Sequence, residues 1–155
     1  MIGNAEQLMR EALREAEAAG LAGEYPIGAV VAIDSEIVSR GRARHLERRS
    51  QLAHAELEAL LGGGEPLWSR HEEAVLVTTV EPCPMCIGAV VMADVPHIVY
   101  SVDDPFVQTT HILEVPYVRS HIETYRGGVL AAETHALIER LHPHYSEVLR
   151  RTRPE

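Results

Sequence analysis

The first forty residues change from helical to β-type spacing of apolar residues. Asn4 can cap a helix whose apolar residues recur every three or four positions until Gly20. The small and β-branched residues 27–33 predict a strand, and the Asp34-Ser35 pair predicts a tight turn. Residues 37–38 then resume the β-type pattern. The sequence therefore predicts an amphipathic helix followed by a β-hairpin.

The middle of the chain alternates between helical and β-type segments. Residues 53–61 are rich in Ala, Leu and Glu and predict a short helix, which the glycine loop 62–64 ends. Residues 74–79 and 97–101 predict buried strands, and a helix over 85–93 is predicted between them. This order predicts parallel crossovers, so the fold class is α/β with three layers.

The pattern weakens after residues 103–105 and returns near the C-terminus. Residues 127–128 are both glycine, and residues 129–141 carry a helical stripe that ends near Pro143. No repeat and no linker divides the chain. Its length of 155 residues is that of one ordinary domain. We therefore expect a single domain over 1–155.

Charge and apolar content limit the partners and the compartment. The formal net charge of −9 disfavours large nucleic-acid partners without excluding them, because arginines gather in residues 40–49 and 150–153. No apolar run approaches the roughly 20 residues of a membrane span. Residues 1–10 lack the basic head and apolar centre of a signal peptide. We expect a cytoplasmic protein without a membrane segment.

Two short motifs contain the residue types of a catalytic metal site: His54-Ala55-Glu56 and Pro82-Cys83-Pro84-Met85-Cys86. The C-x-x-C spacing places both sulfurs on one side of a helix start, where unpaired amides and the helix dipole favour thiolates. With His54 as the third ligand, one tetrahedral position stays open, as in catalytic zinc sites. The sequence predicts that His54, Cys83 and Cys86 bind one Zn²⁺.

Other interpretations apply to each motif alone. A C-x-x-C pair also occurs in redox proteins and in half of a four-cysteine structural site, and a single histidine or glutamate is usually structural. The chain has only two cysteines, so the second half of a structural site is missing. The joint pattern H-x-E…P-C-x-x-C is the signature of zinc nucleobase deaminases, whose glutamate is not a ligand. The joint pattern favours catalysis.

The chemistry of deamination gives Glu56 a role. Replacing an amino group on an aromatic ring carbon requires a strong nucleophile and two proton deliveries. Zinc lowers the pKa of a bound water from about 15.7 towards roughly 7, although two thiolate ligands weaken this effect. We expect Glu56 to take the water proton, give it to the ring nitrogen and later protonate the departing ammonia.

At these motifs the sequence resembles the cytidine deaminase superfamily, within it the branch of tRNA adenosine, guanine and cytosine deaminases. The resemblance extends over residues 24–30, 53–56 and 80–89. It implies a central mixed five-stranded sheet flanked by helices, one zinc per subunit and a homodimer. It also implies substrate-binding residues, which are Pro26, Ile27, Gly28, Ala55, Pro82 and, by a looser match, Asp104.

The sequence departs from this branch close to the expected pocket. A family asparagine is replaced by Ala43, and a usual Asp-Pro pair is replaced by Ser50-Gln51. Losing a hydrogen-bonding amide changes discrimination between substrates. The leading hypothesis is therefore a deaminase of a small free base, nucleoside or related amino heterocycle of the guanine or cytosine type.

Two alternatives to a small-molecule deaminase remain. A tRNA adenosine deaminase that forms inosine is favoured by the arginines of 40–49 and by the basic tail. A noncatalytic zinc-binding partner subunit is disfavoured because Glu56 is retained. The shape of the pocket depends on the weakly patterned residues 105–126, where several side chains could face substrate or solvent: Phe106, His111, Glu114, Tyr117 and His121.

Overall fold

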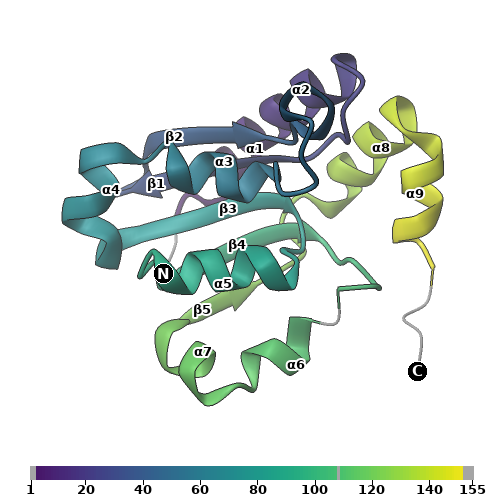
Figure 1. The fold of residues 1–155 in the computed structure, drawn as a ribbon. Coiled ribbons are helices and arrows are strands. Elements are labelled where there is room, and N and C mark those ends of the chain that lie inside the picture. Colours follow the sequence, from purple (N-terminus) through teal and green to yellow (C-terminus); the bar gives the residue numbers. More distant parts are fainter. Residues whose placement is uncertain (1–2, 108, 152–155) are drawn as a thin grey trace.

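A computed structural model describes residues 3–107 and 109–151. It contains one five-stranded sheet with the strand order β2-β1-β3-β4-β5 (Figure 1). β1 pairs antiparallel with β2 and β3, whereas β3, β4 and β5 run parallel. This is the expected mixed five-stranded α/β sheet. The strands are β1 (Gly28–Ile33), β2 (Glu36–Arg42), β3 (Ala74–Val80), β4 (His97–Val102) and β5 (Thr124–Arg126).

Helices cover both faces of the sheet, as the three-layer prediction requires (Figure 1). The two long helices, α1 and α8, contact one face, and α3 and α5 lie on the other. The helices are α1 (Ala5–Leu21), α2 (His45–Arg48), α3 (Ala55–Leu61), α4 (Gly64–Arg70), α5 (Pro84–Met92), α6 (Thr109–Leu113), α7 (Pro116–His121), α8 (Ala131–Leu141) and α9 (Pro143–Leu149), with a 3₁₀ turn at His71–Glu73.

The core lies on both faces of the sheet because side chains alternate along each strand. In β1, Val31 packs with Ile87 of α5, and its neighbour Val30 packs with Met9 of α1. All four side chains are buried. A third cluster joins the carboxyl ends of β3 and β4 to α8 and α9, and its members are Val80, Val102, Ile138 and Leu149. This cluster holds α9 at the sheet edge where β3 and β4 end.

A glycine lets α3 lie directly on β2. A Cβ atom at Gly41 would collide with the backbone oxygen of Ala55 and the backbone nitrogen of Ala59. No side chain other than hydrogen fits there without moving the helix. Gly41 therefore fixes the depth of the α3 N-terminus, where His54 and Glu56 lie.

The structure corrects several sequence-based boundaries. Asn4 occupies the N-cap of α1, but its side chain makes no capping hydrogen bond. The predicted glycine loop 62–64 is shortened to a turn at Gly62 and Gly63, because Gly64 begins α4 with a positive φ of 55°. The helical stripe predicted from residue 129 begins at Ala131, and Pro143 starts the further helix α9. Proline suits the first turn of a helix, so it starts α9 at the point where α8 ends.

Candidate active site

The N-termini of α3 and α5 meet at one edge of the sheet. His54 is the N-cap of α3 and Cys83 is the N-cap of α5, both in extended backbone conformation. β1 is antiparallel to β3, so the start of β1 and the end of β3 lie at this same edge. The topology therefore brings together motifs that are about thirty residues apart in the sequence.

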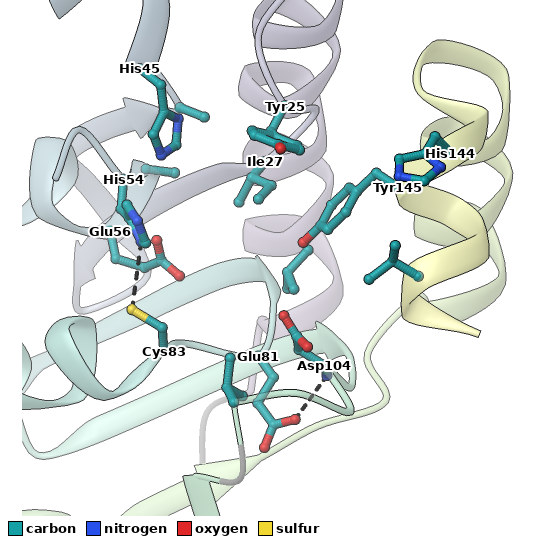
Figure 2. A pocket seen from close by; sticks show the side chains of 15 residues that line it. Tyr25, Ile27, His45, His54, Glu56, Glu81, Cys83, Asp104, His144 and Tyr145 are labelled. Atoms are coloured by element: carbon teal, nitrogen blue, oxygen red, sulfur yellow. Dashed lines mark hydrogen bonds between the residues drawn. The ribbon is translucent and has the colours of Figure 1, made fainter. Parts of the chain in front are cut away.

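Three side chains converge here with the geometry of a metal site. The Nδ1 atom of His54 lies 3.6 Å from Sγ of Cys83 (Figure 2) and 3.5 Å from Sγ of Cys86. All three atoms lie within 4.8 Å of one another. Tetrahedral zinc with ordinary Zn–S and Zn–N bonds requires N···S separations of about 3.6 Å. Both N···S separations match this value, so the three residues fit a zinc ion.

The charges of the two sulfurs also suit a cation. Hydrogen bonds from the Cys86 thiol and from His54 lower the pKa of Cys83 to about 4, although burial opposes them. The pKa of Cys86 is raised by its hydrogen bond to Cys83 and by its burial. The residues alone thus stabilise one thiolate. A bound cation would stabilise the second thiolate.

Glu56 lies beside this group without belonging to it. The three-residue group among the described residues contains no carboxylate. The Glu56 side chain is only 4% exposed, and its Oε1 accepts a hydrogen bond of 3.2 Å from Oγ1 of Thr78. Burial raises the pKa of Glu56, while His54 and Thr78 partly oppose this shift. A carboxyl group with a raised pKa can both accept and return a proton.

A cavity of about 320 Å³ opens onto His54, Glu56 and Cys83. Its other walls come from the β1 entrance, the segment around α2, the ends of β3 and β4, and α9 (Figure 2). The apolar lining side chains are Ile27, Ala43, Ala55, Val80, Val107 and Val148. An apolar cavity with a few convergent polar groups is the usual form of a small-ligand site.

The predicted substrate residues divide into two groups. Ile27, Ala55 and Asp104 line the cavity. Pro26, Gly28 and Pro82 are buried and are not among its lining residues. A Cβ atom at Gly28 would meet the backbone of α1, and the Gly28 amide donates to Oγ1 of Thr79. The carbonyl of Pro82 accepts a hydrogen bond from Thr109. A substrate-binding role for all six residues stays a prediction.

The stretch 105–126 contributes Val107 to the cavity and none of the five side chains that the sequence left open. Phe106 and Tyr117 are 50% and 57% exposed, and His111 and Glu114 are exposed as well. His121 contacts Tyr117 in its own helix. This stretch forms α6, α7 and β5.

Sequence reasoning missed the aromatic side of the cavity, which contains Tyr25, His45, His144 and Tyr145. The Tyr25 ring stacks on His142 at 5.1 Å and meets Tyr145 edge-on at 5.2 Å. His142 accepts a hydrogen bond from the Tyr145 amide and so caps α9. No short motif links these residues, because Tyr25 and α9 meet only in the folded chain.

The His54, Cys83 and Cys86 group, which could hold a metal ion, lies beside the buried carboxyl group of Glu56. The family model for the cytidine and deoxycytidylate deaminase zinc-binding region matches residues 3–102. This match covers well over half of the chain. The chain therefore belongs to the cytidine and deoxycytidylate deaminase family, in agreement with the resemblance seen in the sequence.

Individual relatives refine this comparison. The chain is 45% identical over 102 residues to a tRNA-specific adenosine deaminase of Bacillus subtilis. The matched region covers 64% of this chain and 63% of that protein. A solved structure from a study of A-to-I editing by tRNA:A34 deaminases has a TM-score of 0.76, at 30% identity over 84% of this chain and 98% of that chain. The guanine deaminase of Bacillus subtilis has a TM-score of 0.60, at 28% identity over 74% of this chain and 71% of that chain.

The comparisons do not test the expected location of the protein or its expected homodimer. Within residues 3–107 and 109–151, no helix is long and apolar enough to cross a membrane. The expectations of a cytoplasmic location and a homodimer stay predictions.

Proposed function

We propose that this protein is a zinc-dependent hydrolytic deaminase that replaces an exocyclic amino group of a nucleobase by oxygen. The observation that carries the proposal is the buried Glu56 carboxyl group beside the His54, Cys83 and Cys86 cluster. Water is consumed, a C–O bond forms at the ring carbon, the C–N bond breaks and ammonia leaves.

Each residue has a defined task in this reaction. His54, Cys83 and Cys86 would hold the zinc, which when bound supplies a more acidic water at neutral pH. Glu56 accepts the proton of the attacking water and passes it to the ring nitrogen. It then takes the remaining proton of the former water from the hydroxyl group on the ring carbon and delivers it to the departing amino group, which leaves as ammonia. Thr78 orients the carboxylate for both transfers through its hydrogen bond.

The proposed substrate is an adenosine in tRNA, with inosine as the product. This proposal is supported by the 45% identity to the Bacillus subtilis tRNA-specific adenosine deaminase and by the TM-score of 0.76 to the tRNA:A34 deaminase structure. This proposal ranks tRNA adenosine above a small free base and so reverses the preference drawn from the sequence. An adenosine in RNA must leave its stack to enter a cavity of this kind.

Deamination of a small free base such as guanine is the second candidate, and the charge of the protein favours it. The net charge is −9, and two arginines of the α2 segment are paired with carboxylates. Arg44 binds Glu47, and Arg48 binds Glu58 at 3.0 Å. Paired arginines have less charge to offer to an RNA backbone. The methyl group of Ala43 also offers no hydrogen bond to a substrate.

One ammonia-release assay separates the two candidates. Zinc-loaded protein is incubated with a tRNA anticodon stem-loop that contains adenosine and, separately, with adenine, guanine, cytosine, their nucleosides and amino-triazines. Turnover of the stem-loop alone, with a steep fall as salt rises, would support the tRNA substrate. Turnover of a free base with little salt dependence would support the second candidate. If zinc-loaded protein released ammonia from none of these compounds, the proposed deaminase function would be contradicted.

A further inference from the structure

His45 lies in the cavity next to the zinc-ligand cluster and has no task in the proposed chemistry. Its ring centroid is 5.2 Å from that of His54, and Figure 2 shows the two rings at the same end of the cavity. Its Nδ1 atom is buried and has no hydrogen-bond partner among the described residues. Nε2 is therefore the ring nitrogen through which His45 can bind a ligand.

The backbone around His45 is held firmly from outside the cavity. The carboxylate of Glu24, itself 6% exposed, accepts hydrogen bonds of 2.9 Å from the amides of Leu46 and Glu47. The Ser50 amide donates to the carbonyl of His45 at 3.1 Å. The Tyr25 ring meets the His45 ring edge-on at 5.7 Å. The imidazole is thus positioned before any ligand binds.

The lining close to His45 in sequence and space offers few other polar groups. Ile27, Ala43 and Ala55 line the cavity with side chains that contain no polar atom. Of the polar side chains that line the cavity here, His54 and Glu56 have tasks in the proposed chemistry, so His45 and Tyr25 are left to pair with a hydrogen-bonding atom of the base. Leaving such an atom unpaired weakens binding roughly 10- to 100-fold.

We propose that His45 is a specificity-determining residue, which donates a hydrogen bond from Nε2 to an acceptor atom of the bound heterocycle. The acceptor is a ring nitrogen or a ring carbonyl oxygen. This inference rests on the proposed function, since it concerns how the same site selects its base.

The tautomer follows from the surroundings of the ring. A neutral imidazole carries one N–H donor and one acceptor nitrogen. With the proton on Nδ1, a buried N–H would point at no acceptor among the described residues. With the proton on Nε2, the buried Nδ1 carries no hydrogen, and Nε2–H can donate to a ligand in the cavity that His45 lines. His45 therefore selects acceptor atoms.

The test combines two substitutions with altered substrates. His45→Phe keeps an aromatic ring and removes the hydrogen bond, while His45→Gln retains a side-chain donor. His111→Phe is the matched control, because His111 is exposed and does not line the cavity. Each variant is assayed on the best substrate and on analogues that lack one ring acceptor at a time. Zinc content and Tm are measured in parallel.

The expected result is a coupling between one variant and one analogue. His45→Phe lowers kcat/KM roughly 10- to 100-fold, which corresponds to the loss of one buried hydrogen bond. One analogue lowers the kcat/KM of the wild type by a similar factor but does not lower that of His45→Phe further. His45→Gln regains part of the loss, and His111→Phe behaves as wild type.

Other outcomes would overturn the role of His45 and leave the proposed function standing. These are an unchanged kcat/KM in His45→Phe, or an equal loss on every analogue, which would indicate a merely structural role. If the wild type deaminates nothing, the proposed function fails, and His45 is tested by calorimetric binding of the same bases. Equal affinities of the wild type and His45→Phe would then overturn the inference.

Discussion

Thr78, in the buried strand β3, donates a hydrogen bond of 3.2 Å from Oγ1 to Oε1 of Glu56 at the start of α3. Both side chains are almost fully buried. The bond connects the centre of the sheet to the proton carrier of the proposed reaction. It stabilises the charged carboxylate against the burial that raises the pKa of Glu56.

Removing this bond should change the pH dependence of activity. In Thr78→Val the pKa of Glu56 rises further, because a group that stabilises the carboxylate is lost. Activity requires the carboxylate form, so the acidic limb of the kcat/KM profile moves to higher pH. The profile of zinc-loaded protein measures this shift.

Thr79→Val is the matched control for that profile. Thr79 is also buried, but its hydroxyl accepts a hydrogen bond from the Gly28 amide rather than contacting Glu56. Its loss should lower Tm without moving the acidic limb. An identical limb in Thr78→Val and the wild type would remove the proposed link between Thr78 and Glu56.

Zinc should stabilise the folded protein as well as support its activity. Chelation leaves two buried or half-buried sulfurs and His54 close together, and the pKa of Cys86 then favours its thiol. We expect chelated protein to lose activity and to unfold at a lower temperature, with both properties restored by added zinc. Calorimetry with metal analysis checks this, and an unchanged Tm after complete zinc removal would contradict it.

Gly41 should be intolerant of any side chain. Gly41→Ala forces β2 and α3 apart, because the new Cβ collides with the backbone of Ala55 and Ala59. Overpacking of this kind typically costs about 1–3 kcal/mol. Since α3 begins next to His54, zinc affinity should also fall. Urea unfolding and zinc titration measure the two effects.

Gly88→Ala provides the opposite control within α5. A Cβ atom at Gly88 would meet nothing within 4 Å. Alanine is favoured over glycine in a helix interior by up to about 1 kcal/mol, so this variant should equal or exceed the wild type in stability. If both glycine variants behaved alike, the close approach of α3 to β2 would not be the cause.

Glu24 should matter for substrate binding more than for zinc binding. Glu24→Ala removes the carboxylate that holds the start of α2, and His45 with it. Hydrogen bonds to a charged group contribute about 1.5–3 kcal/mol, so we expect lower stability and a raised KM at unchanged zinc content. Glu47→Ala, which removes an exposed ion pair with Arg44, should change stability by less than about 1 kcal/mol. Equal effects of the two variants would contradict this role.

The sequence predicted the parts of the protein that short stretches of chain determine. The strands and the three-layer α/β class follow from local apolar patterns, and the grouping of His54, Cys83 and Cys86 follows from motifs at two helix starts. The mixed five-stranded sheet followed from the family resemblance. The contribution of α9 and Tyr25 to the cavity wall does not follow from local patterns. Their contact depends on the packing of Leu149 and on the stacking of Tyr25 with His142. Four-residue α2 and three-residue β5 are too short to leave a periodic signal.

The central claim is that Glu56 moves protons beside a zinc ion that it does not bind. The most direct measurement is ammonia release by Glu56→Ala, together with its zinc content. Loss of general acid–base catalysis typically costs about 10²–10⁴-fold in rate. We predict a loss of at least this size with zinc still bound at one per chain, whereas ordinary turnover by the zinc-loaded variant would contradict the account.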